Sequence, residues 1–290
     1  MLVLGAGWVG SRLVQVLLEQ GRSVVATHRP GTVAQEKPPY FRPVEVSVPA
    51  EGASESAPSG PRFSSARFEL DDRETWSNLP PASSVAAVVI TFPLATAPEE
   101  FWEAYLRDVR SVLCYSSTSV YQVDAPGQRV DESTPTKPAG RAAAEAYALS
   151  RGATVLTISG IFGERRSPRG ICTCLSTYTS AGGALNGNKR VNMVHVDDII
   201  AASLACLRAP RASSATRINV AGHHFLLSEL IEHCKHPPIP DGPDTDLSSK
   251  CVCSQRLRKL MPRDFDFIQP MAPDTPAEPP FTASASAPRA

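Results

Sequence analysis

A glycine-rich stretch near the N-terminus limits the possible folds of this chain more than any other feature. It reads Gly5-Ala6-Gly7-Trp8-Val9-Gly10 and follows the apolar run Met1–Leu4. Apolar residues then recur at helical spacing up to Leu17, and a second apolar run covers Ser23–Thr27. The pattern GxGxxG, placed between a strand and a helix and followed by a second strand, is typical of a βαβ unit that binds a dinucleotide.

Each glycine of this stretch has its own expected role. Gly5 permits the tight turn, Gly7 lets the backbone approach a pyrophosphate, and Gly10 lets the helix pack closely on the strand. The start of the helix offers N–H groups and the positive end of its dipole to the phosphates. The alternative, a glycine-rich turn without a ligand, is disfavoured by this placement. The expected cofactor contacts are Gly5, Ala6, Gly7, Trp8, Val9 and Gly10, together with Phe92 at the end of a later strand.

The end of the second strand bears on the choice between NAD and NADP. Sites that prefer NAD usually carry an acid there for the ribose 2′-OH. This chain instead reads Thr27-His28-Arg29, without an acid. An arginine can pair bidentately with a 2′-phosphate, and Thr27 and His28 can assist it. We therefore expect NADP, with NAD still possible. The alternative is a solvated Arg29 at a strand end.

The rest of the chain alternates between strand-like and helix-like segments. This alternation predicts an α/β fold with a doubly wound parallel sheet of the Rossmann type. Residues 31–65 are rich in Pro, Ser, Gly and Ala, which predicts a flexible loop. Residues 269–290 are rich in Pro, Ala and Ser, which predicts a disordered tail. Further strands are expected at Ala66–Leu70, Val85–Phe92, Val112–Ser116 and Val155–Ser159, and helices from Asp71, at Phe101–Val109 and at Ala139–Arg151.

Charge and cysteine content exclude several classes of protein. Lys and Arg number 29 and Asp and Glu number 29, so no basic excess indicates a nucleic acid or an anionic membrane as partner. No apolar run approaches the ~18 residues of a membrane span. Seven cysteines without a CxxC pair indicate reduced thiols and no metal site. We expect a cytoplasmic protein, or an organellar one if a transit peptide precedes this sequence.

Six motifs in order resemble the extended short-chain dehydrogenases/reductases of the NAD-dependent epimerase/dehydratase group. The resemblance covers about residues 1–260. It implies one extended unit over residues 1–268, in which residues 1–160 mainly bind the dinucleotide and residues 161–192 and 222–268 mainly form a small C-terminal substrate side. The motifs are Gly5–Gly10, Ser116-Ser117-Thr118-Ser119-Val120-Tyr121, Val130-Asp131-Glu132, Gly160-Ile161-Phe162-Gly163, Val194-His195-Val196-Asp197-Asp198-Ile199 and Arg217-Ile218-Asn219-Val220-Ala221.

The catalytic pattern of that family is broken in this chain. The family has a Tyr-x-x-x-Lys pair, in which the lysine helps the tyrosine act as acid and base. Here the two positions fall on Lys137 and Arg141. A Gly-Arg pair at this helix start also occurs in an atypical branch of the family. The resemblance leaves Ser117 to hold the reacting oxygen and Tyr121 as an alternative proton donor.

Tyr147 is a second candidate for the tyrosine of the family's Tyr-x-x-x-Lys pair. With Ser150 and Arg151 it resembles a Tyr-x-x-Ser-Lys motif, but it lies near the far end of its expected helix. Eight residues from Ala139 correspond to ~12 Å of helix, so we expect Tyr147 away from the cofactor.

On the substrate side, Arg166 is a candidate to clamp a phosphate or carboxylate. His195 is a second candidate, because histidine is the side chain that can change its charge around neutral pH. A solvated basic loop is the alternative for Arg166, and a packing role is the alternative for His195.

The resemblance implies an NAD(P)-dependent oxidoreductase or epimerase that acts on a small polar or sugar-nucleotide-like molecule. A catalytically inactive NAD(P)-binding sensor or partner-binding protein is the alternative. The sequence does not define the oligomeric state.

Overall fold

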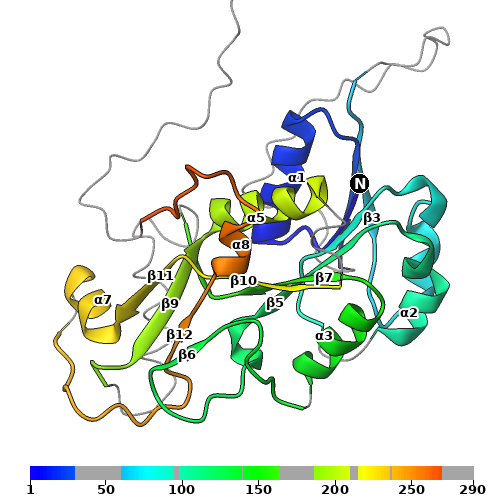
Figure 1. Cartoon of the computed structure of the whole chain (residues 1–290). Helices are drawn as coiled ribbons and strands as arrows, with labels where there is room; N and C mark the ends of the chain where they lie inside the picture. The colour runs from blue at the N-terminus through cyan, green and yellow to red at the C-terminus, as the bar shows by residue number, and fades with distance from the viewer. Residues whose placement is uncertain are drawn as a thin grey trace, which may run out of the picture.

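A seven-stranded parallel sheet forms the centre of the molecule (Figure 1). The computed structural model describes residues 1–29, 60–94, 98–138, 140–163, 186–209, 215–235 and 237–269. The strand order is β10-β7-β5-β4-β1-β2-β3, and every neighbouring pair is parallel. The strands are β1 (Leu2–Leu4), β2 (Val24–His28), β3 (Phe63–Arg67), β4 (Val88–Ile90), β5 (Val112–Ser117), β7 (Thr154–Ile158) and β10 (Arg217–Val220).

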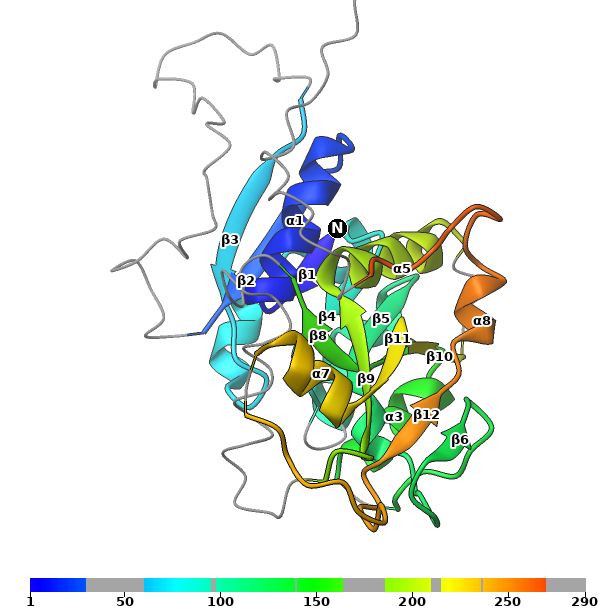
Figure 2. The ribbon, with the colours of Figure 1, turned by 90° about the vertical axis from the view of Figure 1, so that its left-hand side faces the viewer.

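Helices cover both faces of this sheet, as a doubly wound fold requires. On one face lie α1 (Trp8–Glu19) and α5 (Val196–Arg208), whose apolar sides pack into one core cluster (Figure 2). The other face carries α2 (Glu99–Ala104) and α3 (Arg141–Ser150), which pack into a second cluster. Apart from the edge strand β3, the strands between these layers are mostly buried and apolar, because both faces of the sheet are covered.

Two small sheets stand beyond the β10 side of the main sheet. β8 (Gly160–Phe162), β9 (Arg190–His195) and β11 (His223–Leu226) form one of them and pack against α7 (Leu227–His233). The other pairs β6 (Gln128–Val130) with β12 (Lys250–Val252), which leads into α8 (Gln255–Arg258). Segments far apart in sequence thus meet at this end of the molecule (Figure 1).

The predicted fold class is confirmed, but several element bounds are wrong. The third strand is β3 (Phe63–Arg67), not Ala66–Leu70, so it begins within the segment expected to be a loop. The apolar run Val85–Phe92 holds only the short β4. Asp72 caps a 3₁₀ helix at Arg73–Asn78, where an α-helix was expected. Residues 31–59 and 270–290 lie outside the described residues.

The cysteines differ in state. Cys114, Cys206, Cys251 and Cys253 form no disulfide. Cys234 is disulfide-bonded, so the expectation of reduced thiols is wrong for this residue.

Among the described helices, none combines the length and hydropathy of a membrane span. Nor do the described His, Cys, Asp and Glu side chains form a group of three or more that could hold a metal ion.

Candidate functional site

The strand order of the main sheet reverses between β1 and β4, and this reversal places the site. From β1 the chain moves outward through β2 to β3, and from β4 it moves the other way through β5 and β7. Connections that diverge in this manner leave a crevice at the carboxyl ends of the two central strands, where open α/β sheets bind their ligands. The turn Gly5–Gly10 follows β1 at this crevice, and Thr91 and Phe92 follow β4.

The first and third glycines are required by the packing of the chain itself. Gly5 has φ +96°, a conformation that L side chains rarely adopt, and a Cβ there would lie 3.0 Å from the Phe92 ring. A Cβ at Gly10 would overlap the carbonyl oxygen of Gly5. Thr91 closes the turn, because its hydroxyl donates to the Gly5 carbonyl. A side chain at either Gly5 or Gly10 would therefore disrupt the turn itself.

Thr27 supports this turn from β2. Its hydroxyl oxygen accepts a hydrogen bond from the Gly5 N–H at 2.9 Å, and its carbonyl accepts one from the Ala6 N–H at 2.7 Å. The side chain is buried. Thr27 thus positions the glycine turn, and its hydroxyl is directed at Gly5 rather than past the end of the strand.

Gly7 differs from the other two glycines, because no neighbour requires it. Its φ is −68°, which any residue adopts, and a Cβ there would meet nothing within 4 Å. Gly7 is the N-cap of α1, yet within the described part of the chain no side chain caps this helix and its first turn holds no acid. Among the residues that the structure describes, none fills the space at the positive end of the helix dipole, beside the β1–β4 crevice. This open space forms a cradle that fits a pyrophosphate.

His28 and Arg29 stand at the same edge of the sheet. His28 is the last residue of β2 and pairs in register with Arg67 of β3. Arg29 follows directly and is exposed. Both side chains therefore lie at the carboxyl end of the strand next to the glycine turn, where the ribose of a dinucleotide reaches in this fold.

Ser117 and Lys137 both bind the short turn Thr118–Val120 that follows β5. Ser117 is the last residue of this strand, and its Oγ accepts a hydrogen bond from the Ser119 N–H at 3.3 Å. Lys137 Nζ donates to the Ser119 carbonyl at 3.0 Å, and its backbone N–H donates to the Val120 carbonyl. A hydroxyl and an ammonium group are thus both held on this turn, two strands from the glycine turn, since only β4 separates β5 from β1.

Tyr121 and Arg141 belong to a buried polar network instead. The Tyr121 hydroxyl donates to Asn219 Oδ1 at 2.5 Å, and burial raises the pKa of its phenol although the Arg217 guanidinium, 5.9 Å from the ring, opposes the shift. Arg217 pairs with Glu145 at 2.9 Å. Arg141 begins α3, and its charge acts on Glu145 one turn further along.

Glu145 is the centre of this network. It is 3% exposed, accepts a hydrogen bond from the Ser116 hydroxyl, and faces Arg217, which comes from a strand 72 residues later. Burial raises the pKa of Glu145, while the charge of Arg217 lowers it. This pairing is not among those predicted from the sequence. Its only available signal was an acid within an alanine-rich helix and a basic residue that begins a strand.

Tyr147 lies apart from the crevice, as its position in the helix predicts. Its ring contacts Trp102 of α2 edge-on, with centroids 6.1 Å apart, and the Arg151 guanidinium lies 5.2 Å from its centroid. It packs against the second core cluster.

On the proposed substrate side, His195 has a clear local role. Its Nδ1 accepts a hydrogen bond from the Asp197 N–H, which caps α5, and its ring packs edge-on against Phe162. A Cβ at Gly163 would lie 3.2 Å from His195 Nε2 and 3.5 Å from the Trp8 ring, so these groups converge near the start of α1. Arg166 lies outside the described residues.

Asp198 lies in the first turn of α5 and ties it to the C-terminal segment. Its Oδ2 accepts a hydrogen bond from the Ile268 N–H at 3.1 Å. The side chain is buried, and this burial raises its pKa to about 6.

The raised pKa of Asp198 gives a prediction for stability. The folded state holds the proton more tightly than the unfolded chain, whose pKa is 3.8. The unfolding free energy should therefore fall as the pH rises from about 4 to 6, by roughly 3 kcal/mol for a shift of this size. Asp198→Asn keeps an oxygen for Ile268 and should remove this dependence. Urea unfolding at several pH values measures it, with the exposed Asp264→Asn as control. Parallel profiles for wild type and Asp198→Asn would contradict the prediction.

Comparison with known proteins adds three findings. The model of the NAD dependent epimerase/dehydratase family matches residues 1–221. No relative was found among curated proteins. Several solved structures share the fold at low sequence identity.

The similar structures cover nearly the whole chain. One is MoeE5 in complex with UDP-glucuronic acid and NAD, at 19% identity and TM-score 0.60, with 92% of this chain and 93% of that chain covered. Another is dTDP-glucose 4,6-dehydratase from Bacillus anthracis str. Ames in complex with NAD, at 16% identity and TM-score 0.62, with 92% of this chain and 90% of that chain covered. A third is yeast methylglyoxal/isovaleraldehyde reductase Gre2 complexed with NADPH, at 16% identity and TM-score 0.62, with 92% of this chain and 93% of that chain covered. At these identities the likeness shows the fold.

Proposed function

The chain belongs to the NAD dependent epimerase/dehydratase family, whose model matches residues 1–221, and from this premise we propose that it is an NAD(P)-dependent oxidoreductase or epimerase. Its substrate is a small polar molecule or a sugar nucleotide. The observation that carries the proposal is the β1–β4 crevice, which has the open Gly7 cradle on one side and, on the other, the turn after β5 to which Ser117 and Lys137 are bound. Solved structures of the same fold bind NAD with UDP-glucuronic acid, or NADPH.

The glycine turn would hold the cofactor. Gly7 and the start of α1 would receive the pyrophosphate, while Thr27 keeps the turn in shape through Gly5 and Ala6. Arg29 and His28 would receive the adenosine ribose. When bound, a nicotinamide cofactor supplies a carbon that accepts or donates a hydride.

We assign the preference to NADP because of Arg29. A 2′-phosphate carries negative charge, which a guanidinium binds bidentately, and no acid stands at the end of β2 to receive a 2′-OH. Arg29→Ala should weaken NADPH binding by about 1.5–3 kcal/mol, the range for hydrogen bonds to charged groups, and leave NADH nearly unchanged. Fluorescence titration of both cofactors measures this, with Arg22→Ala as a control at an exposed arginine before β2. Tighter binding of NADH than NADPH by the wild type would contradict the assignment.

Ser117 and Lys137 would act on the substrate oxygen. The Ser117 hydroxyl accepts from the Ser119 N–H, and within the described part of the chain no acceptor uses its proton. That proton can be donated to a carbonyl or hydroxyl oxygen of the substrate. The Lys137 ammonium, held on the Ser119 carbonyl, places positive charge beside the oxygen at which negative charge develops.

The proposed role of Ser117 predicts a loss of turnover. Ser117→Ala removes a donor aimed at the reacting oxygen and should lower kcat/KM by about 10²-fold or more. Ser119→Ala is the matched control, because it keeps both backbone hydrogen bonds and should change the rate little. The assay screens aldehydes, ketones and sugar nucleotides with NADPH, then compares the variants on the best substrate. Equal rates for Ser117→Ala and wild type would overturn the assignment of Ser117.

A further inference from the structure

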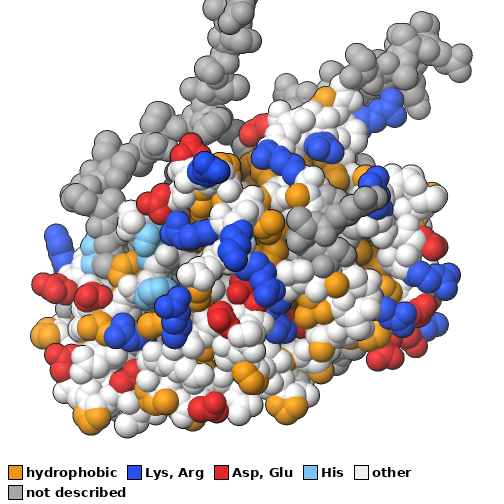
Figure 3. Space-filling view, viewed as in Figure 1, with side chains coloured by type: hydrophobic (Ala, Val, Ile, Leu, Met, Phe, Trp, Pro, Cys, Tyr) orange, Lys and Arg blue, Asp and Glu red, His pale blue; other side chains and the backbone are white. Residues whose placement is uncertain are grey.

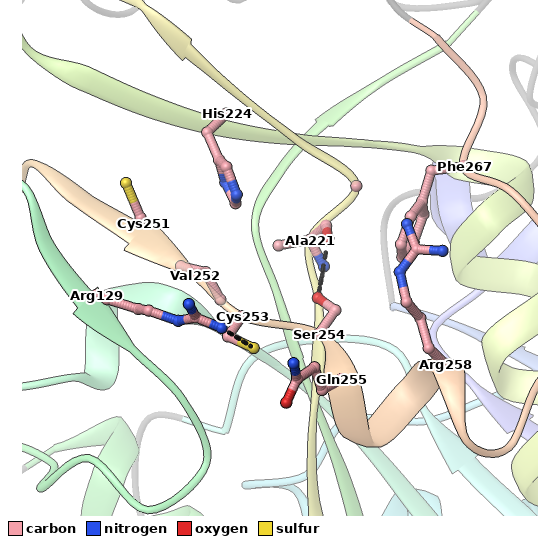
Figure 4. A pocket seen from close by; sticks show the side chains of 11 residues that line it. Arg129, Ala221, His224, Cys251, Val252, Cys253, Ser254, Gln255, Arg258 and Phe267 are labelled. Atoms are coloured by element: carbon pink, nitrogen blue, oxygen red, sulfur yellow. Dashed lines mark hydrogen bonds between the residues drawn. The ribbon is translucent and has the colours of Figure 1, made fainter.

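A pocket of about 280 Å³ lies apart from the β1–β4 crevice, between β6, β12, α8 and the C-terminal segment (Figure 4). None of the residues that line it belongs to the glycine turn or to the Ser117 turn. We call it the β12 pocket. Its chemically distinctive lining residues are Arg129, His224, Cys251, Cys253, Arg258 and Phe267.

Two free thiols share one wall of the β12 pocket. Cys251 lies in β12, where it pairs in register with Arg129 of β6, and Cys253 follows the strand with its N–H on the Val130 carbonyl. Residues two apart on an extended chain point to the same side, about 6.6 Å apart along the chain. A disulfide brings its Cβ atoms to within about 4.5 Å. The two thiols are therefore both open to a reagent in the pocket but too far apart to pair with each other without bending the strand.

The charge of the exposed Arg129 acts on both thiols, but its hydrogen bond is to Cys253. Arg129 Nη2 donates to Cys253 Sγ at 3.5 Å, and Figure 4 shows the guanidinium directed at this sulfur. Across the pocket, the Arg258 guanidinium lies 5.1 Å from the centroid of the Phe267 ring, where Asp266 neutralises part of its charge at 3.7 Å. Burial lowers the pKa of His224, so this lining residue is neutral at pH 7 and the charge comes from the arginines.

The surroundings of the pocket are also basic. Residues 247–263 include five Lys or Arg and no Asp or Glu, although the whole chain is neutral. Lys and Arg side chains accordingly gather over the face that carries α8 (Figure 3). A field of one sign around a pocket raises the local concentration of oppositely charged small molecules. The ligand favoured here is an anion.

We propose that Cys253 is a site of thiol–disulfide exchange with an anionic low-molecular-weight disulfide, such as glutathione disulfide. The Cys253 sulfur, as thiolate, attacks one sulfur of the reagent, whose S–S bond breaks while a new S–S bond to Cys253 forms. The other half leaves as a thiolate and takes up a proton, equivalent to the one that Cys253 released. Arg129 attracts the carboxylates of the reagent and faces the negative charge that passes to the leaving sulfur.

The test compares two disulfides of opposite charge on the full chain. The protein is incubated at low ionic strength with glutathione disulfide or with cystamine, which is cationic. Trypsin should release residues 251–256 as one peptide, because Lys250 precedes it and Arg256 ends it. Fragment ions then assign the modification to Cys251 or Cys253. We expect glutathione disulfide to modify Cys253 about tenfold faster than Cys251, and faster than cystamine modifies it, as steering by charge predicts.

Variants of Arg129 decide whether its charge is responsible. Arg129→Gln should slow the reaction of Cys253 with glutathione disulfide about tenfold but not the reaction with cystamine, whereas Arg129→Lys should keep most of the rate. Equal modification of Cys251 and Cys253, a faster reaction with cystamine in the wild type, or an unchanged rate in Arg129→Gln would each overturn the proposal. None of these outcomes depends on the proposed enzymatic activity.

Discussion

Arg217→Met should lower the free energy of unfolding by about 3–5 kcal/mol, the cost of leaving a buried charge without its partner. Arg217 is the counter-ion of Glu145, which is 3% exposed and also accepts from the Ser116 hydroxyl. Methionine keeps the length of the side chain but supplies no charge and no hydrogen bonds. Glu145 must then stay charged in an apolar layer or take up a proton. Urea unfolding at pH 7 measures the loss.

Two further variants separate this effect from a general sensitivity to mutation. Arg107→Met removes an arginine whose side chain is 64% exposed and pairs with Glu103 on the surface, so it should cost no more than about 1 kcal/mol. Adding Glu145→Gln to Arg217→Met removes the stranded charge and should restore part of the stability. A cost for Arg217→Met no larger than that for Arg107→Met would contradict the importance of the Glu145–Arg217 pair.

Gly7→Asp should abolish dinucleotide binding, with a loss of about 10²-fold or more, since like charges placed together at an interface cost several kcal/mol. A side chain at Gly7 would enter the cradle at the start of α1 and set a carboxylate against the pyrophosphate. The same change should not harm the fold. An aspartate at an N-cap accepts hydrogen bonds from the first turn and favours the helix dipole, so stability should rise by a few tenths to about 1 kcal/mol.

Gly7→Asp should weaken NADPH binding and raise the free energy of unfolding, so the two effects can be measured separately. Thermal unfolding and NADPH titration are measured on the same preparations of wild type, Gly7→Asp and Gly7→Ser. The serine variant caps the helix without a charge, so its affinity for NADPH should lie between those of the other two. A Gly7→Asp protein that binds NADPH as tightly as the wild type would contradict the placement of the cofactor, and one that unfolds would contradict the open position of Gly7.

The central features of the fold follow from local sequence signals. The turn Gly5–Gly10 combines a steric requirement, seen at Gly5 and Gly10, with an open position at Gly7, and all three signals lie within six residues. The strands beside it are continuous apolar runs because the sheet is covered on both faces. The position of Ser117 at the end of β5 also follows from one such run.

Features that depend on long-range contacts could not be predicted in this way. β3 is an edge strand with exposed Ser64 and Ser65, so it lacks the apolar run that marks a covered strand. The Glu145–Arg217 pair joins residues 72 positions apart. The β12 pocket likewise forms only because β12 returns to pair with β6. In each case the sequence shows the residue types but not their partners.

A crystal structure of the protein with NADPH tests the central claim most directly. We expect the pyrophosphate to lie against the first turn of α1 at Gly7, the 2′-phosphate beside Arg29, and the nicotinamide on the Ser117 side of the β1–β4 crevice. NADPH bound at any other place, such as the β12 pocket, with the Gly7 cradle left empty, would contradict it.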